Sequence, residues 1–225
     1  MAVRLSVILP VLDEATGIAT ALAALAPLRQ RGHELIVVDG GSRDGTRERC
    51  RGLADRVLEA ACGRARQMNA GAAQACGEVL LFLHADSQLP PGAATQIAAA
   101  LAAGARWGRF DVRIEGRSPM LRVVAAAMNR RSRWTGIATG DQAIFVQRAL
   151  FEQIGGYPDQ PLMEDVELSR RLRRVAWPAC LRDRVSTSGR RWETRGVWRT
   201  ILLMWALRWR YWRGASPEVL ARAYR

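Results

Sequence analysis

The 225-residue chain contains no lysine, so all 34 of its basic residues are arginine. It has only two histidines, His33 and His84, and its four cysteines form no CxxC pair or other spacing typical of metal ligands. This arrangement argues against a zinc module and against a disulfide-rich secreted scaffold. We therefore interpret the cysteines as small buried side chains of a protein in a reducing compartment.

Long hydrophobic runs are also absent. No stretch reaches the roughly 18 uncharged apolar residues that a transmembrane helix needs. The apolar run that follows Met1 ends at Pro10, which is too short for a signal peptide. Since 49% of the residues are nevertheless hydrophobic, the composition excludes a disordered chain and predicts one cytoplasmic α/β domain.

The positive charge is concentrated towards the C-terminus. The formal net charge is +13, and residues 170–225 contain 15 of the 34 arginines but only three acidic residues, Asp183, Glu193 and Glu218. A general bias towards arginine would not place the excess in one quarter of the chain. The distribution predicts an anionic partner, either a membrane surface or a phosphate-bearing substrate. We do not expect nucleic acid, because no motif for it is present.

Short aliphatic runs alternate with helical spacing in the first half of the chain. The runs cover residues 5–9, 35–38, 57–58 and 79–83, and the helical segments cover residues 15–29, 44–52 and 64–76. Continuous aliphatic strands predict a mostly parallel sheet with helices on both faces. Binding groups collect at the carboxyl ends of such strands. Asp13 or Glu14, Asp39 and Asp86 follow three of them, so we expect these carboxylates to converge on one cleft.

The second half is more mixed. Residues 108–114 alternate like a strand with one solvent-facing side, and residues 143–146 predict another strand. Further helices are expected at 119–131, 163–174 and 197–213, with extended chain over 177–188. We expect a single domain over residues 1–225, with one half to about residue 90, a second over 91–190 and a basic amphipathic tail over 191–225.

Four motifs occur in the order and spacing of one known family. They are residues 6–14 (SVILPVLDE), 37–46 (VVDGGSRDGT), 77–86 (GEVLLFLHAD) and 163–168 (MEDVEL). From about residue 4 to residue 174 the chain resembles family 2 glycosyltransferases, which implies a Rossmann-like GT-A fold. Residues 63–69 (GRARQMN) and 140–142 (GDQ) are similar to a compact bacterial subgroup described as selenium- or arsenosugar-associated transferases.

The resemblance implies transfer of a sugar from a nucleotide-diphosphate sugar to an acceptor hydroxyl, with inversion at the anomeric carbon. The first half would bind the donor, with Asp39 at the base, Glu14 at the ribose and Arg64 at a phosphate. The residues implied in donor binding are Pro10, Val11, Leu12, Glu14, Asp39, Arg64, Arg66, Asn69, Ala85 and Asp86.

A divalent cation, Mg²⁺ or Mn²⁺, is implied as cofactor, because the diphosphate leaving group develops negative charge. Asp86 is the expected ligand, since hard cations take oxygen ligands and often only one or two from the protein. The family usually has an acid two residues earlier, where this chain has His84, and Ser87 replaces another common acid. His84 could ligate a softer ion such as Mn²⁺, bind the nucleotide or be purely structural, so the identity of the metal stays open.

The acceptor hydroxyl must lose a proton as it attacks, which calls for a carboxylate base. The resemblance implies Asp165 for this role, with Glu164 as the second choice. Asp165 could instead simply cap its helix, close to the positive end of the helix dipole. Acceptor contacts are expected from Gly140, Asp141 and Gln142, and from a flexible flap that carries Arg190, Arg191 and Trp192.

Tryptophan and arginine alternate along the predicted helix 197–213. One interpretation is an interfacial helix that lies on an anionic membrane, at the inner face of the cell membrane, which would suit a lipid-linked acceptor. The other is that its apolar stripe packs on the domain or on a second copy in a homodimer. The sequence leaves both open.

Three other functions compete with the transferase, of which one is excluded and two stay open. A nicotinamide dehydrogenase would need GxGxxG after the first strand, where this chain has residues 10–14 (PVLDE). A sugar nucleotidyltransferase usually opens with a glycine-rich basic loop, which is missing, although it shares the fold and stays an alternative. The third is a non-catalytic protein that binds nucleotide sugars or membranes, which the unusual His84 keeps open.

Overall fold

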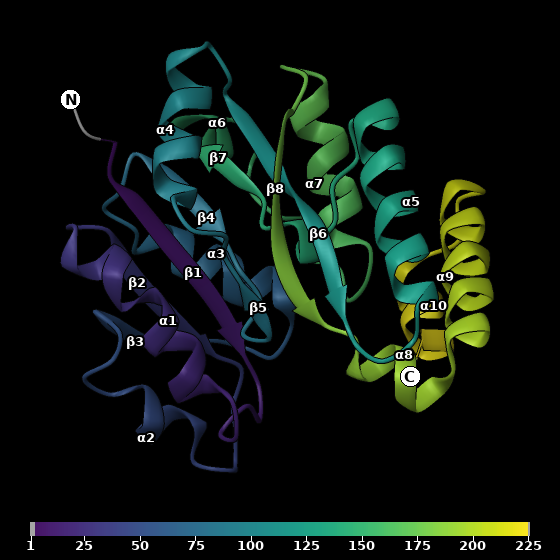
Figure 1. Ribbon diagram of the computed structural model, residues 1–225, viewed down its shortest axis with the longest axis horizontal. Helices are drawn as coiled ribbons and strands as arrows, with labels where there is room; N and C mark the ends of the chain where they lie inside the picture. Colours follow the sequence, from purple (N-terminus) through teal and green to yellow (C-terminus); the bar gives the residue numbers. More distant parts are fainter. Residues whose placement is uncertain (1–2, 225) are drawn as a thin grey trace.

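A sheet of eight strands, in the order β3-β2-β1-β4-β7-β6-β8-β5, runs through the computed structural model, which describes residues 3–224 (Figure 1). The strands are β1 (Leu5–Val11), β2 (Glu34–Asp39), β3 (Arg56–Glu59), β4 (Val79–Phe82), β5 (Ser87–Gln88), β6 (Trp107–Glu115), β7 (Phe145–Gln147) and β8 (Ala179–Ser188). Strands β3, β2, β1 and β4 are parallel, as the aliphatic runs predicted. Beyond β4 the sheet is mixed, because β7 runs antiparallel to both β4 and β6.

Helices cover both faces of this sheet. They are α1 (Ile18–Gln30), α2 (Thr46–Cys50), α3 (Arg64–Ala73), α4 (Ala93–Ala102), α5 (Met120–Thr135), α6 (Arg148–Gln153), α7 (Glu164–Arg173), α8 (Arg190–Arg195), α9 (Val197–Trp212) and α10 (Pro217–Tyr224), with a 3₁₀ turn η1 (Gly140–Gln142). The sequence interpretation missed α4, α6 and α10. In the described part of the chain, no helix is long and apolar enough to cross a membrane.

Two hydrophobic clusters fill the space between the sheet and the helices. Leu5, Val7 and Leu9 of β1 point to the cluster under α1 and α4. Ile8, between them in the sequence, points to the opposite cluster under α3, α6 and α7. This alternation follows from the two-residue period of a strand, and it explains why β1 is apolar on both sides. The predicted α/β fold with a mostly parallel sheet is confirmed.

Strand β6 differs from its prediction. The alternating residues 108–114 indicated one solvent-facing side, but only Arg113 and Glu115 of this strand are exposed. Arg109 is 0% exposed, and its guanidinium pairs with the carboxylate of Asp111. Strands β7 and β8 pair with the two edges of β6. Separate hydrophobic clusters cover the strand, because Phe110 packs in the cluster under α1 and α4 and Val112 packs against α5. The charged residues Arg109 and Asp111 gave the sequence an amphipathic pattern, although they are buried as an ion pair.

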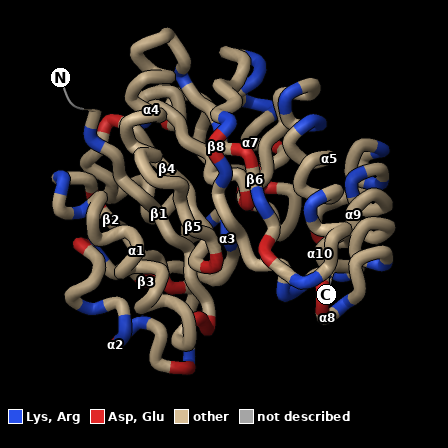
Figure 2. The backbone as a smooth tube through the Cα atoms, viewed as in Figure 1, with Lys and Arg blue, Asp and Glu red and all other residues tan. Residues whose placement is uncertain are grey.

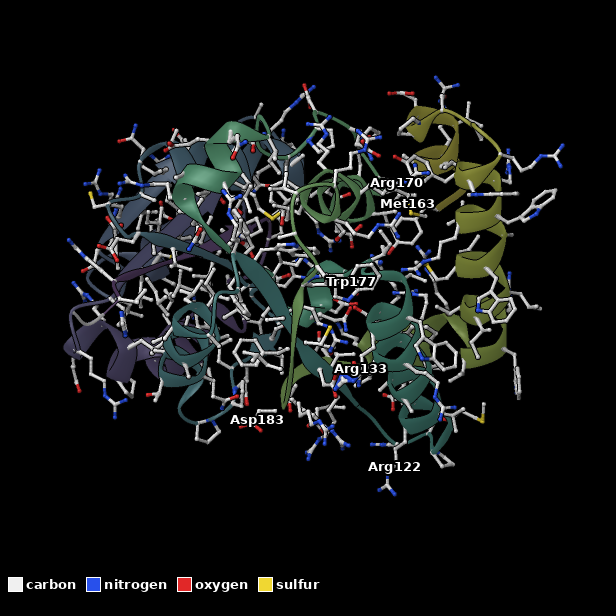
Figure 3. The ribbon with its side chains drawn as sticks, turned by 90° about the horizontal axis from the view of Figure 1, so that it is seen from above. Arg122, Arg133, Met163, Arg170, Trp177 and Asp183 are labelled. Atoms are coloured by element: carbon white, nitrogen blue, oxygen red, sulfur yellow. The ribbon has the colours of Figure 1, made fainter. Side chains whose placement is uncertain are left out.

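The C-terminal helices form a separate layer beside the sheet (Figure 1). Leu207 of α9 and Leu220 of α10 are buried against Met163, at the start of α7. Figure 3 shows Met163 and Arg170 facing α9, and the guanidinium of Arg170 lies 5.9 Å from the ring centroid of Tyr211. Helix α9 therefore packs on the domain with one face. Arg225, the last residue of the predicted tail, lies outside the described residues.

Candidate active site

A cleft of about 1020 Å³ opens where β1 and β4 end. Segments far apart in the sequence supply its polar wall: the loop after β1, the start of α3, the loop after β4, η1, the start of α7 and the start of α8. Its charged and polar lining includes Glu14, Arg64, His84, Asp86, Arg131, Asp141, Glu164, Asp165, Arg190 and Arg191. The structure thus brings most of the predicted site residues together.

One wall of the cleft carries Glu14 after β1, Asp86 after β4 and Arg64 at the start of α3. Asp86 is exposed to the cleft, and the hydroxyl of Ser87 donates to its Oδ1 at 3.4 Å. Burial raises the pKa of Glu14, and the negative charge of Asp86 adds to this shift, while Arg190 opposes it. Two carboxylates that repel each other within an open cleft can both be stabilised by a cation between them.

Asp39 and the strand end Pro10, Val11 and Leu12 do not line the cleft. The Asp39 side chain is 1% exposed, and its oxygens accept hydrogen bonds from the backbone N–H groups of Gly41 and Ser42 and from the Ser42 hydroxyl. The turn that follows β2 satisfies its own carboxylate. In this structure Asp39 shapes that turn, so a base contact would need the turn to open.

The ends of β1 and β2 are joined by Gln67, which the sequence interpretation missed. This side chain is 3% exposed, and its amide donates to the carbonyls of Val11 and Val38, each at 2.8 Å. Gly40 leaves room for it, since a Cβ there would lie 3.1 Å from the Gln67 amide. A buried polar residue in the segment 63–69 was the available signal.

Arg66 and Asn69 lie on α3 but turn away from the cleft. Nε of Arg66 contacts Oδ1 of Asp159 at 2.7 Å on the surface. The amide of Asn69 donates to the Tyr157 carbonyl at 2.8 Å and accepts from the Tyr157 N–H at 2.9 Å. Neither residue lines the cleft, and their contacts with the donor stay predictions. Ala85 is half-buried and packs against the core.

The two acids predicted for catalysis begin α7. Met163 adopts a left-handed conformation with φ of 65°, and the helix then starts with Glu164 and Asp165. The Asp165 carboxylate accepts hydrogen bonds from the N–H of Gly140 at 2.9 Å and of Val166 at 2.7 Å. Burial raises the pKa of both acids, and the charge of Asp165 raises that of Glu164 further. Such carboxylates are suited to accept a proton.

His84 faces Asp141 across the cleft, with 3.4 Å between Nδ1 and Oδ1. Burial acts to raise the pKa of Asp141, but the hydrogen bond and charge of His84, together with Arg64 and Arg191, lower it overall. The ring of His84 lies against Gly140, where a Cβ would be 2.5 Å from Cε1 and Nε2. This glycine therefore sets the position of the imidazole.

The predicted acceptor segment 140–142 is only partly in the cleft. Gly140 and Asp141 line it, but Gln142 is 0% exposed. The Gln142 side chain accepts from the Thr139 N–H at 3.2 Å and donates to Asn129 at 3.3 Å. It therefore holds the 3₁₀ turn in place from behind instead of facing an acceptor.

The segment predicted as a flexible flap is regular structure. Ser188 ends β8, the N–H of Gly189 donates to the Glu115 carbonyl at 2.7 Å, and α8 begins directly afterwards. Arg190, Arg191 and Trp192 all line the cleft from α8. The segment is thus helical, because pairing of β8 with β6 continues to the first turn of α8, and its flexibility stays a prediction.

The residues present fit a hard cation held mainly by other ligands. Among residues 3–224 no group of three or more His, Cys, Asp or Glu side chains surrounds a common point. Asp86 offers carboxylate oxygens to the cleft, and Arg191 interacts electrostatically with both Asp86 and Asp141. One or two carboxylates are what Mg²⁺ uses when substrate phosphates complete its shell. The imidazole Nδ1 of His84 is beside Asp141, and its Nε2 lies against Gly140.

Residues 6–154 match the family model described as "Glycosyl transferase family 2". The chain belongs to glycosyl transferase family 2. A relative described as "Probable glycosyltransferase YdaM", from Bacillus subtilis (strain 168), is 26% identical over 242 residues, covering 96% of this chain and 56% of its own length. The subgroup suggested by residues 63–69 stays a prediction.

Solved structures of other proteins share the GT-A fold with this family 2 chain. S. aureus TarS (1–349) matches with a TM-score of 0.67 at 20% identity over 83% of this chain and 60% of its own. The mannosyltransferase PcManGT from Pyrobaculum calidifontis, in complex with GDP-Man and Mn²⁺, matches with a TM-score of 0.67 at 21% identity. The match covers 100% of this chain and 69% of the PcManGT chain. The chain thus spans about 56–60% of the length of the first two relatives.

Proposed function

We propose that this chain is a metal-dependent, inverting glycosyltransferase that moves a sugar from a nucleotide-diphosphate sugar to an acceptor hydroxyl. One observation carries the proposal: Asp86 and Arg64 lie in the same cleft as Asp165, although they precede it by 79 and 101 residues in the sequence. The donor side and the proton acceptor of a transfer reaction are then within one site.

The donor side uses the groups around Asp86. Asp86, together with the substrate phosphates, would hold Mg²⁺ or Mn²⁺, which supplies charge neutralisation for the leaving diphosphate. Arg64, Arg190 and Arg191 face the same region and can donate hydrogen bonds to phosphate oxygens. Structures of PcManGT with GDP-Man and Mn²⁺ and of TarS with UDP-GlcNAc support a donor of this class.

Asp165 serves as the general base. The acceptor oxygen attacks the anomeric carbon, its proton passes to the Asp165 carboxylate, and the bond to the diphosphate oxygen breaks with the electron pair leaving on the diphosphate. The N–H groups of Gly140 and Val166 hold this carboxylate in one orientation. Attack opposite the leaving group inverts the anomeric carbon, because no protein nucleophile takes part. Glu164 is the second choice for the base.

The far end of the cleft is apolar and supports a lipid-linked acceptor. Helices α5 and α9 line it with the side chains Met120, Val123, Val124, Ala127, Met128, Trp198, Ile201, Met204 and Trp205. An acceptor with an apolar chain would be held there while its polar end reaches Asp165. The same helix α9 would then dock at the inner face of the cell membrane.

Membrane docking is supported by an exposed stripe along α9, in which Trp198 and Trp205 also border the cleft. Trp198, Leu202, Trp205, Trp209 and Trp212 recur every three or four residues and are 59–74% exposed. Figure 2 shows arginines along this helix, and they flank the stripe at positions 199, 210 and 213. Exposed tryptophan beside arginine suits the interface of an anionic membrane.

Release of nucleoside diphosphate from a panel of UDP- and GDP-sugars tests the proposed reaction. We expect Mg²⁺- or Mn²⁺-dependent release, at least about 100-fold slower in Asp86→Ala and in Asp165→Asn, because each removes a group that acts in the transition state. Asp183→Asn, outside the cleft, is the matched control. Release of pyrophosphate from a nucleoside triphosphate and a sugar phosphate would indicate the nucleotidyltransferase instead. Donor binding without any turnover would indicate the non-catalytic protein.

A further inference from the structure

Helix α5 presents a continuous stripe of side chains to the cleft. The stripe is apolar at first and ends in a charged residue. Met120, Val124, Ala127 and Met128 follow one another at helical spacing, and all of them line the cleft. Arg131 continues this stripe by about one turn and also lines the cleft. The apolar groove between α5 and α9 therefore ends in a guanidinium.

Two nitrogen atoms of the Arg131 guanidinium have no hydrogen-bond partner among the described residues. Its Nε and Nη2 atoms are buried, and no described residue accepts a hydrogen bond from either atom. By contrast, the fully buried Arg109 donates to Ser132 at 3.0 Å, to the Asn129 carbonyl at 3.1 Å and to Asp111. A buried charged donor that stays unsatisfied destabilises the folded state, so most such groups are paired.

The nearby acids are already engaged. Asp111 is shared by Arg109 and by Arg133, which contacts it at 2.7 Å. The oxygens of Asp165 are bound by two backbone N–H groups, and no ion pair within 4.0 Å joins Asp165 to Arg131 in the described residues. The charged groups that act on Arg131 are Asp165 and Arg109. Arg131 thus lies on the side of the proton acceptor Asp165. Arg64 and Arg191 interact instead with Glu14, Asp86 and Asp141, and Arg64 also with Glu164.

We infer that Arg131 binds an anionic group of the acceptor, a phosphate or carboxylate attached to an apolar chain that lies between α5 and α9. This inference rests on the proposed transferase function and narrows its acceptor to amphipathic anions. A guanidinium recognises such a group with two parallel hydrogen bonds. The acceptor would arrive with its charge at Arg131 and its hydroxyl beside Asp165.

Binding of small acceptor mimics to the full chain tests this role. The probes are hexyl phosphate, hexanoate, hexanol and inorganic phosphate, each measured by calorimetry with wild type, Arg131→Gln and Arg130→Gln. Arg130 is exposed on the same helix and provides a matched loss of charge. We expect at least one of the two chain-bearing anions to bind wild type and Arg130→Gln alike and about tenfold or more weaker to Arg131→Gln, a loss typical of a charged hydrogen bond. Tighter binding of hexyl phosphate than of inorganic phosphate would distinguish a chain-bearing head group from free phosphate.

Several results would overturn the inference. These are equal binding of hexanol and the anions, unchanged binding in Arg131→Gln, no binding of any anion to wild type, or binding of inorganic phosphate that matches hexyl phosphate. A further one is a loss of UDP or GDP affinity in Arg131→Gln as large as that for hexyl phosphate, which would place Arg131 at the donor. Donor turnover, tested with Asp86→Ala, reports separately on the proposed function and can succeed while this inference fails.

The melting temperature of a second variant separates ligand binding from a structural role. Arg131→Met replaces an unpaired buried guanidinium by an apolar side chain of similar length. If Arg131 waits for a ligand, this variant melts at the same or a higher temperature, because an unsatisfied charge is removed. A lower melting temperature together with unchanged anion binding would show that Arg131 serves the fold.

Discussion

The acid pair at the start of α7 shows how burial sets chemistry at single residues. Glu164 is buried and Asp165 half-buried, and desolvation raises the pKa of each. Backbone N–H groups lower the pKa of Asp165 but do not cancel the shift. A base with a raised pKa holds a proton more readily once the proton is transferred to it.

The pH profile of the transfer reaction should reflect this shift. Since Asp165 must be ionised to accept a proton, kcat/KM should fall as the pH falls through its folded pKa, which is raised above the ordinary value of about 3.9 for aspartate. Initial rates between pH 4 and 9 measure this acidic limb. An activity that stays level down to pH 4 would contradict the role of Asp165. The variant Glu167→Gln, on the same helix but not in the cleft, should keep the wild-type profile.

Gly140 is predicted to control His84. A Cβ at this position would lie 2.5 Å from the imidazole, so Gly140→Ala should displace the ring and break its contact with Asp141. We expect kcat/KM to fall about tenfold or more, as small displacements in an active site commonly do. Gly17→Ala is the control, because a Cβ at Gly17 meets nothing within 4 Å. Equal activity in both variants would show that the position of His84 is unimportant.

At the scale of elements, helix α9 has one buried face and one exposed face. Leu207 is buried against α7 and α10, which confirms that one stripe packs on the domain. The opposite stripe of tryptophan stays exposed. Packing on the domain therefore applies to one face of this helix, and membrane contact stays a prediction for the exposed face.

Flotation with liposomes tests the exposed face of α9. Trp205→Ser combined with Trp209→Ser should abolish binding to vesicles with anionic lipid, because both rings would otherwise enter the interface. Wild-type binding should weaken at high salt and with neutral lipid. Trp177→Ser removes a tryptophan that is 56% exposed elsewhere, and it should have no effect. Absence of flotation together with a concentration-dependent dimer in sedimentation would assign this face to a second copy.

For the whole molecule, the cleft links three parts of the chain that meet only after folding. Glu14 and Asp86 follow strands of the parallel half of the sheet, and Asp165 comes between strands of the mixed half in the sequence. Helix α8 supplies a further part of the cleft wall. Ligands that bind such a folded site stabilise the whole domain.

Thermal denaturation with UDP or GDP therefore tests the complete site. The melting temperature should rise with a nucleoside diphosphate plus Mn²⁺ or Mg²⁺ and much less with either alone, because cation and phosphates complete one another's coordination. Asp86→Ala should remove the joint effect, whereas Asp183→Ala should keep it. A rise that is independent of the cation would contradict metal dependence.

Much of the fold was readable because local signals agreed with the sheet. The aliphatic runs predicted β1, β2 and β4, and their parallel order placed Glu14 and Asp86 at one edge. The acidic residues of the segment 163–168 were correctly placed at a helix start. Helix α4 was missed because its alanine-rich sequence gives a weak pattern, and α10 because it has only 8 residues. The helical form of α8 was missed because the strand pairing that leads into it has no local signal.

The sequence by itself determined the family, the parallel half of the sheet and the acids that lie in the cleft, because period-two and period-3.6 patterns and strand exits are local properties. Only the tertiary structure decided that the side chains of Asp39 and Gln142 hydrogen-bond within their own turns. It also decided that both faces of β6 are covered and that two nitrogens of Arg131 lie without a partner at the end of an apolar groove. Burial and hydrogen-bond partners depend on which segments meet in space, and that information is distributed over the whole chain.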